Sequence, residues 1–174
     1  MINILLTGPP GIGKTTVLNR IKNYIKGNNL VVGGVYCPEL CQNGQRIGFK
    51  IIDLITNDEG ILSHINIDGP RLGKYRVNLK DLDTVGTSAI YKALDESDFI
   101  LIDEIAPMEL NSPNFCEAVL EAFNSSKPVI AVIHKRSKNP FIINLKKRDD
   151  VEIYEITKEN RNTIHREVLR NILN

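Results

Sequence analysis

No apolar run in the sequence is long enough to span a bilayer, and the short apolar segment at the N-terminus is interrupted at Gly8 by a loop rich in glycine and proline. A membrane-spanning helix needs about 20 consecutive apolar residues, and a signal peptide needs an apolar stretch of about 7–15 residues. The formal net charge is +1, so the chain needs neither a nucleic acid nor an anionic membrane as partner. We therefore expect a cytoplasmic protein with no membrane partner and no clear nucleic-acid partner, and the sequence leaves its protein partners unknown.

Cysteine is also scarce. The three cysteines, Cys37, Cys41 and Cys116, cannot form a fully paired disulfide framework, which favours a reducing cytosol. Cys37 and Cys41 lie four residues apart, as in half of a zinc site, but no second Cys or His pair has ligand spacing. Free thiols are therefore favoured over a zinc site.

What is present is the pattern of a single α/β domain over residues 1–174. Hydrophobic residues make up 42% and charged residues 25% of the chain, ordinary values for a soluble globular domain. Apolar strands alternate with amphipathic helices, which implies a mostly parallel sheet covered on both faces. We expect strands at residues 4–6, 98–104, 127–134 and 151–157. We expect helices at residues 14–26, 81–94 and 112–124, over a short stretch from 140, and over about the last fifteen residues.

Residues 31–79 interrupt this alternation and are expected to form a small antiparallel β insertion. The runs LVVGGVYCPEL and RIGFKIIDLIT flank the turn Asn43-Gly44, a pattern typical of a hairpin. A third strand is expected over ILSHINI and a short strand over YRVNL.

The segment Gly8–Thr15 matches G-x-x-x-x-G-K-[ST], the phosphate-binding loop or Walker A motif. Gly11 and Gly13 permit backbone angles that a β-carbon would forbid, so successive N–H groups can point inward and bind an anion. Lys14 adds a cation for the β- and γ-phosphates, and the Thr15 hydroxyl can ligate Mg²⁺. A helix that begins at Lys14 brings the positive end of its dipole to the same point.

The run Phe99–Glu104 places two acids at the end of an apolar strand, as in a Walker B motif. Ligands of an open α/β sheet bind at the carboxyl ends of its strands, so these acids should emerge beside the loop. We expect Asp103 to belong to the Mg²⁺ shell, through water, and Glu104 to orient or deprotonate an attacking water. Lys14 and Glu104 are thus the expected catalytic residues, and Thr15 and Asp103 the expected metal-binding residues.

Seven segments along the chain carry a resemblance to a known family: GPPGIGKTT, GQRIGFKIIDL, RLGKYRV, FILIDEIAPMEL, SPNFCEAV, KPVIAVIH and ENRN. Together they resemble the small nucleoside-triphosphatase family first known from thermophiles, which has a human cancer-related member. The resemblance covers nearly the whole chain and implies a three-layer P-loop NTPase fold of RecA type with a mixed sheet. It also implies Mg²⁺-dependent hydrolysis of ATP, GTP and other nucleoside triphosphates to diphosphate and phosphate, with little base preference.

The same resemblance marks two nucleotide-binding segments, although chemistry alone singles out only the two acids of the second. The residues so expected to bind nucleotide are Gly8, Pro9, Pro10, Gly11, Ile12, Gly13, Lys14, Thr15, Thr16, Ile100, Leu101, Ile102, Asp103, Glu104, Ile105, Ala106 and Pro107. The family usually has Gly where Ala106 stands and often Arg where Cys41 stands. The first is a mild change beside the site, and the second weakens any role of side chain 41 in substrate binding.

Other side chains are open to two interpretations. Arg46, Arg71 and Arg76 lie in the insertion and could reach the γ-phosphate or be solvated strand and loop residues. His134 ends an apolar strand and could sense the γ-phosphate or simply terminate the strand. Arg161 follows the last strand and could stack on the base or be a surface cation.

Two rival functions on the same fold remain open. The first is a nucleotide or small-molecule kinase, whose acceptor pocket and lid the insertion could supply. The second is a nucleotide-gated adapter, in which slow hydrolysis resets partner binding. The sequence contains neither the guanine-reading run [NT]-K-x-D nor the transporter run LSGGQ, which is consistent with broad base tolerance.

Overall fold

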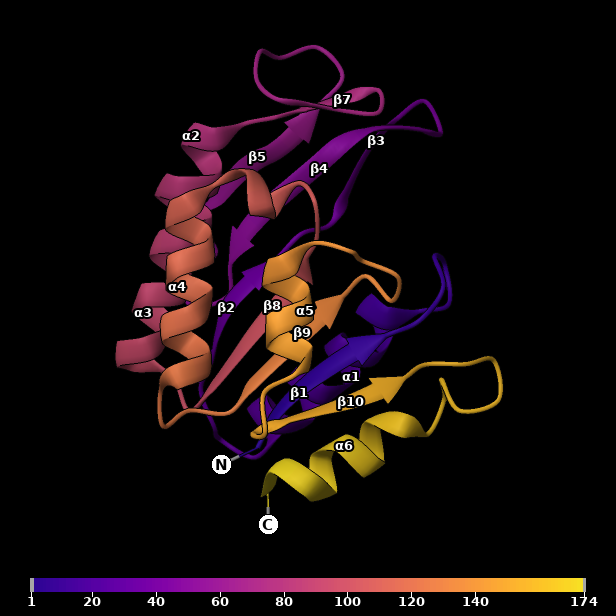
Figure 1. Cartoon of the computed structure of the whole chain (residues 1–174), viewed down its shortest axis with the longest axis vertical. Coiled ribbons are helices and arrows are strands. Elements are labelled where there is room, and N and C mark those ends of the chain that lie inside the picture. The colour runs from indigo at the N-terminus through magenta and orange to yellow at the C-terminus, as the bar shows by residue number, and fades with distance from the viewer. Residues whose placement is uncertain (1, 174) are drawn as a thin grey trace.

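The computed structural model describes residues 2–173 and arranges ten strands in one mixed sheet with helices on both faces (Figure 1). The parallel part of the sheet contains, in order across it, β10 (Val151–Glu155), β1 (Asn3–Thr7), β9 (Val129–Ile133), β8 (Phe99–Ile105) and β2 (Val32–Tyr36). Each of these strands is parallel to its neighbour. The first and last strands of the chain are therefore side by side.

The antiparallel part of the sheet continues outward from β2. Its strands, in order, are β4 (Gln45–Asp53), β5 (Glu59–His64), β7 (Tyr75–Val77) and β6 (Arg71–Leu72), and β3 (Glu39–Gln42) pairs with β4. All of these pairings, including that of β4 with β2, are antiparallel. The α/β fold with a parallel core and added antiparallel strands confirms the fold class that the sequence predicts.

Helices cover the two faces of the parallel part. In chain order they are α1 (Lys14–Gly27), α2 (Leu79–Asp81), the π-helical segment η1 (Leu82–Thr87), α3 (Ser88–Glu96), the short 3₁₀ helix η2 (Glu109–Asn111), α4 (Pro113–Asn124), α5 (Pro140–Lys146) and α6 (Ile164–Leu173). Helices α3, α4 and α5 pack on one face, and α1 and α6 pack on the other. Within residues 2–173, no helix has the length and apolar character that crossing a membrane requires.

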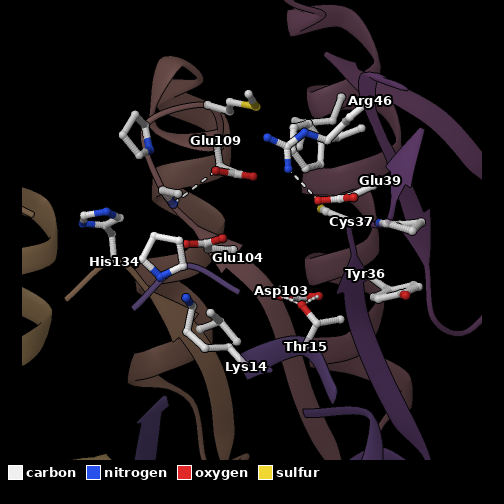
Figure 2. A pocket seen from close by; sticks show the side chains of 18 of the residues that line it. Lys14, Thr15, Tyr36, Cys37, Glu39, Arg46, Asp103, Glu104, Glu109 and His134 are labelled. Atoms are coloured by element: carbon white, nitrogen blue, oxygen red, sulfur yellow. Dashed lines mark hydrogen bonds and ion pairs between the residues drawn. The ribbon is translucent and has the colours of Figure 1, made fainter. Parts of the chain in front are cut away.

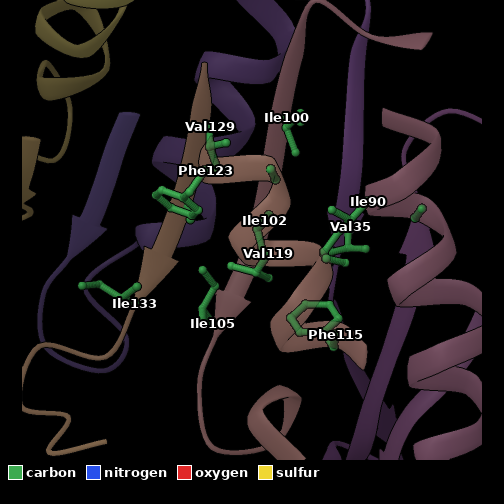
Figure 3. Close-up of a cluster of buried hydrophobic side chains, with 14 of the residues drawn as sticks. Val35, Ile90, Ile100, Ile102, Ile105, Phe115, Val119, Phe123, Val129 and Ile133 are labelled. Atoms are coloured by element: carbon green, nitrogen blue, oxygen red, sulfur yellow. The ribbon is translucent and has the colours of Figure 1, made fainter. Parts of the chain in front are cut away.

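The central strand β8 explains why the apolar run at residues 99–102 is continuous. Ile100 and Ile102 enter the core beneath α3, α4 and α5 (Figure 3), whereas Phe99 and Leu101 enter the core beneath α1 and α6. Successive side chains of a strand point to opposite faces, so a strand covered on both faces needs apolar residues at every position.

The beginning of α4 confirms the predicted helix start at Ser112. The Ser112 hydroxyl accepts a hydrogen bond from the Phe115 N–H at 3.0 Å, and Pro113 occupies the first helical position. Ser112 also donates to the carboxylate of Asp83 in η1, so the same side chain joins two neighbouring helices.

Three details of the predicted elements differ from the structure. The run LVVGGVYCPEL is divided at Pro38 into β2 and β3, and β2 pairs in parallel with β8, whereas β3 to β7 are antiparallel to their neighbours. The strand expected over residues 61–67 ends at His64 and begins at Glu59. The helix expected over residues 81–94 begins at Leu79 and contains the π-helical segment before α3.

Glycine at position 34 accounts for the close pairing of β2 with β8. Gly34 has φ of +104°, and a β-carbon added there would lie 2.0 Å from the carbonyl oxygen of Leu101. Only glycine can adopt this backbone at this distance. Gly34 thus permits parallel pairing in the core, although glycine usually argues against a strand.

Candidate active site

The phosphate loop joins β1 to α1. Gly13 stands immediately before α1 with φ of 107°, and no side chain caps the N-terminus of this helix. The first backbone N–H groups of a helix have no partner within it. They are consequently available to an anion, as expected of this motif.

The loop rests on the segment that follows β10. The Ile156 N–H donates to the Thr7 carbonyl at 2.8 Å. A β-carbon at Gly8 would lie 2.8 Å from the Ile156 carbonyl oxygen. The start of the loop therefore has room only for glycine, because a larger residue would separate it from the last strand.

Lys14 is folded back over the loop. Its Nζ donates to the carbonyl oxygens of Gly8 and Pro9, each at 3.2 Å. Both partners are neutral, and no carboxylate of residues 2–173 forms an ion pair with the Lys14 ammonium. The side chain is thus held at the cavity by its own loop and can exchange these contacts for those of a phosphate.

Thr15 and Asp103 meet directly. The Thr15 hydroxyl lies 3.1 Å and 3.3 Å from the two carboxylate oxygens of Asp103, which is only 3% exposed (Figure 2). Burial, and next the charge of Glu104, raise the pKa of Asp103 to about 7, although Thr15 and Lys14 act in the opposite direction. A bound cation would stabilise the charged form of a buried carboxylate of this kind.

The oxygen atoms of Thr15 and Asp103 fit Mg²⁺ chemically. Within residues 2–173, no group of three or more His, Cys, Asp and Glu side chains is placed to hold a metal. Mg²⁺ does not require such a cage, because it keeps several waters and binds through one or two carboxylates together with substrate phosphates. A hydroxyl and a carboxylate beside a phosphate loop are hard oxygen donors of the required type.

Glu104 extends into the cavity, and Lys14 and His134 lie on neighbouring sides of its carboxylate (Figure 2). Burial raises the pKa of Glu104, while the charges of Lys14 and His134 partly oppose this shift. The peptide bond that joins Asp103 to Glu104 is cis. Of the two acids, Asp103 contacts Thr15 and Glu104 carries the free carboxylate nearer to Lys14.

These side chains line one cavity of about 550 Å³. Its lining comprises Pro10, Gly11, Gly13, Lys14, Thr15, Tyr36, Cys37, Pro38, Glu39, Arg46, Phe49, Leu62, Leu72, Asp103, Glu104, Ala106, Pro107, Met108, Glu109, Val132 and His134. The cavity therefore lies at the carboxyl ends of β1, β8, β9 and β2, where an open α/β sheet binds its ligands.

The second expected nucleotide-binding segment, residues 100–107, contains both core residues and residues that line the cavity. The side chains of Ile100, Leu101, Ile102 and Ile105 are buried in the two cores. Residues 103–104 and 106–107 line the cavity. In this segment, the side chains that can contact a ligand are therefore those of residues 103–104 and 106–107.

The structure distinguishes among the arginines of the antiparallel strands. Arg46 lines the cavity, where its Nε donates to the Tyr75 hydroxyl at 2.9 Å and its side chain forms an ion pair with Glu39 at 2.5 Å. Arg71 and Arg76 are exposed and donate to nearby backbone carbonyls. Within residues 2–173, these two and Arg161 are outside the cavity lining.

Glu109 and Cys37 also line the cavity, although Glu109 was not among the expected site residues and Cys37 was considered only as half of a zinc site. Glu109 is 3% exposed and accepts a hydrogen bond from the Ala106 N–H at 3.1 Å. Burial, and the nearby charges of Glu104 and Asp103, raise its pKa well above the ordinary value, and burial does the same for the Cys37 thiol. The acid six residues after Asp103 was visible in the sequence, but its burial depends on how the chain turns after β8.

A phosphate loop that meets two acids at the carboxyl edge of a parallel sheet defines a nucleotide-binding protein of the P-loop class. A profile of a protein family described as NTPase matches residues 3–169 of the chain. A nucleoside-triphosphatase THEP1 from Methanopyrus kandleri is 40% identical over 172 residues, which cover 98% of this chain and 95% of the relative. Another of that name from Thermotoga maritima is 44% identical over 169 residues, which cover 97% and 94%.

Two solved structures share the fold. The crystal structure of THEP1 from the hyperthermophile Aquifex aeolicus matches with a TM-score of 0.86 and 27% identity over 99% of this chain and 100% of that one. The solution structure of a human cancer-related nucleoside triphosphatase matches with a TM-score of 0.84 and 29% identity over 99% and 97%. The chain therefore belongs to this nucleoside-triphosphatase family of hydrolases, which confirms the family that its sequence segments resemble.

Proposed function

We propose that this protein is a Mg²⁺-dependent nucleoside-triphosphatase of the cytosol, which hydrolyses ATP, GTP and other nucleoside triphosphates to diphosphate and phosphate with little base preference. The observation that carries the proposal is the contact between Thr15, at the start of α1, and Asp103, at the end of β8. It joins the phosphate loop to the two acids within one cavity.

Binding of the triphosphate is assigned to the loop and Lys14. The uncapped N-terminus of α1 offers backbone N–H groups, and the Lys14 ammonium neutralises charge on the β- and γ-phosphates. The two carbonyl contacts of Lys14 can be replaced, because a phosphate carries negative charge and attracts the ammonium more strongly than a neutral carbonyl does.

Thr15 and Asp103 are the residues that would hold Mg²⁺. When bound, the ion neutralises charge on the phosphate oxygens and helps to orient them. Asp103 contributes by its negative charge and by fixing the Thr15 hydroxyl at 3.1 Å. These two side chains are thus assigned to charge balance and orientation.

Glu104 is assigned the role of orienting and deprotonating the attacking water. Its raised pKa brings the carboxylate closer to the operating pH than an exposed glutamate, which suits a general base. A base of this kind accepts the proton as the oxygen of water forms a bond to the γ-phosphorus. The nucleoside diphosphate leaves as the bond to the bridging oxygen breaks.

Base tolerance is supported by the residues that the site uses. The loop, Lys14 and the two acids are all assigned to the phosphates, their bound metal or the attacking water, and none is assigned to the base. The sequence also lacks a guanine-reading run. Phosphate release should be measured with ATP, GTP, CTP, UTP and TTP, each with and without Mg²⁺. We expect kcat/KM values within about tenfold of one another, and loss of turnover without Mg²⁺. A hundredfold preference for one base, equivalent to about 2.7 kcal/mol, would identify a dedicated base-reading enzyme instead.

A further inference from the structure

Glu109 is a buried acid of the cavity to which the proposed mechanism assigns no role. It begins the short helix η2, just after the turn that follows β8, and its side chain is only 3% exposed. Within residues 2–173 it forms no ion pair. Because burying a carboxyl group without a paired cation is unfavourable, its position beside Asp103 and Glu104 needs an explanation.

The carboxyl group of Glu109 holds the turn after β8. It accepts a hydrogen bond from the Ala106 N–H at 3.1 Å, and the Leu110 N–H donates to the Ala106 carbonyl at 3.1 Å. Both peptide groups of Ala106 are therefore fixed by η2. Ala106 is only two residues after Glu104, and Glu104 is close enough to Glu109 for its charge to raise the pKa of Glu109 (Figure 2).

The backbone at Glu104 is outside the regular strand pairing. Ile102 pairs with Ala131 and Ile105 with Ile133, so two residues of β8 lie opposite one residue of β9 between these pairs. On the other side, β2 ends opposite the residue before Glu104. Bulges of this kind redirect a side chain and leave part of the ladder unpaired. The direction of the Glu104 side chain therefore depends on what holds the chain just after it.

Glu109 can hold this turn without carrying a charge. Burial raises its pKa well above the ordinary value, and the charges of Glu104 and Asp103 raise it further. A bound triphosphate adds negative charge and favours the neutral acid still more. The carbonyl oxygen of a neutral carboxyl group still accepts a hydrogen bond. Neutral Glu109 thus keeps its contact with Ala106 and does not repel the substrate.

We propose that Glu109 is a positioning residue for hydrolysis: its contact with the Ala106 N–H holds the turn after β8 and keeps the Glu104 carboxylate directed at the attacking water. Glu109 acts as an uncharged hydrogen-bonding group, and Glu104 alone accepts the proton of the water. The inference rests on the proposed function, because Glu109 acts through Glu104.

The first experiment compares Glu109→Gln with Glu109→Leu. The Gln amide oxygen can still accept from the Ala106 N–H, so kcat should stay within about threefold of wild type. Leu cannot accept, so kcat should fall at least about tenfold, while the affinity for a non-hydrolysable ATP analogue stays within about threefold. The matched control is Glu117→Leu, because Glu117 is an exposed residue of α4 outside the cavity lining.

The second experiment tests whether Glu109 acts through Glu104. Glu109→Leu is combined with Glu104→Gln, and single-turnover hydrolysis is measured for both single variants and the double variant. In the Glu104→Gln protein, adding Glu109→Leu should lower the rate by less than about twofold, because the positioned carboxylate is already absent. The same loss in both backgrounds would show an independent structural effect and overturn the inference.

Two results of the first experiment would also overturn it. The first is a Glu109→Gln protein as slow as Glu104→Gln, which would show that Glu109 must exchange a proton. The second is a Glu109→Leu protein as fast as the Glu117→Leu control. If circular dichroism shows that Glu109→Leu does not fold, Glu109→Gln still decides whether the neutral group suffices. Absence of phosphate release by the wild type would instead contradict the proposed function.

Discussion

At the residue scale, two adjacent acids that share one strand end have different environments. Asp103 is nearly fully buried and contacts Thr15, whereas Glu104 is less buried and is influenced by Lys14 and His134. Neighbouring carboxylates in unlike surroundings commonly serve separate roles. Isosteric amides at the two positions can therefore separate metal binding from proton transfer.

Glu104→Gln should keep nucleotide affinity and lower kcat about 10²–10⁴-fold, the usual contribution of a general base. Asp103→Asn should instead raise the Mg²⁺ concentration needed for half-maximal turnover. Affinity for ATP, Mg²⁺ dependence and single-turnover hydrolysis should be compared for both variants and the wild type. If Glu104→Gln hydrolyses ATP within a fewfold of the wild-type rate, the base is elsewhere, and the buried Glu109 becomes the next candidate.

Asp103 should also make stability depend on pH in the absence of Mg²⁺ and nucleotide. Its pKa rises from 3.8 to about 7, chiefly by burial, so the folded state disfavours the charged form. Between about pH 4 and about pH 7 the unfolded chain has lost a proton that the folded chain keeps at Asp103, so the contribution of Asp103 to the free energy of unfolding falls as pH rises. Asp103→Asn removes the ionisable group and therefore removes this fall in the free energy of unfolding.

The free energy of unfolding of Asp103→Asn relative to wild type should therefore increase from pH 4 to pH 8, by at most about 4 kcal/mol. Urea unfolding at several pH values measures the difference. Saturating Mg²⁺ and ATP should diminish it, because a bound cation favours the charged carboxylate. A difference that stays constant across this pH range would show that Asp103 is already ionised in the folded state.

At the element scale, the pairing of β2 with β8 depends on one backbone position. Gly34→Ala should destabilise the fold by about 3 kcal/mol, because the new β-carbon would lie 2.0 Å from the Leu101 carbonyl oxygen at an unfavourable φ. Gly27→Ala is the matched control, since Gly27 ends α1 with no atom within 4 Å of an added β-carbon. Chemical denaturation should find the control unchanged or slightly more stable. Equal stability of the two variants would mean that β2 can shift away from β8 without cost.

The strands and helices of the parallel part could be predicted because their local patterns agree with their final environments. The run before Asp103 is apolar at every position because both faces are covered, and Ser112-Pro113 begins a helix as these residues usually do. The place of β2 could not be predicted, because its run was expected to pair in a hairpin. Gly33 and Gly34 are explained only by contacts of the folded chain, Gly33 by Ala93 of α3 and Gly34 by Leu101 of β8. Tertiary pairing here overrides local preference.

At the scale of the whole molecule, the phosphate side of the site was visible in the sequence and the opposite side was not. Lys14, Thr15, Asp103 and Glu104 belong to short motifs whose spacing has a direct chemical reason. The apolar side chains Phe49, Leu62, Leu72 and Met108 of the cavity lining instead come from three antiparallel strands and the loop after β8, and their arrangement depends on how these segments pack. Spacing along the chain carries no signal for such a set.

Nucleotide binding should stabilise the whole domain by mass action. Mg²⁺-ATP at about 100 times its dissociation constant adds about 2.7 kcal/mol, which corresponds to about 5–10 °C in the melting temperature of a domain of this size. Lys14→Ala should melt near the wild-type temperature without nucleotide and show little shift with it, since Lys14 lies at the cavity and not in the core. Thermal unfolding followed by circular dichroism tests this. The same nucleotide-induced shift in both proteins would refute the assignment of the phosphate loop.

The order of the strands also determines when, during synthesis, the protein can bind nucleotide. β1 and the phosphate loop are synthesised well before β9 and β10, the two strands that pair with β1. Until residue 156 has been synthesised, the Ile156 carbonyl group that packs against Gly8 is missing. A nascent chain therefore carries its phosphate loop without this support, and nucleotide binding is postponed until β10 and the segment after it have been synthesised.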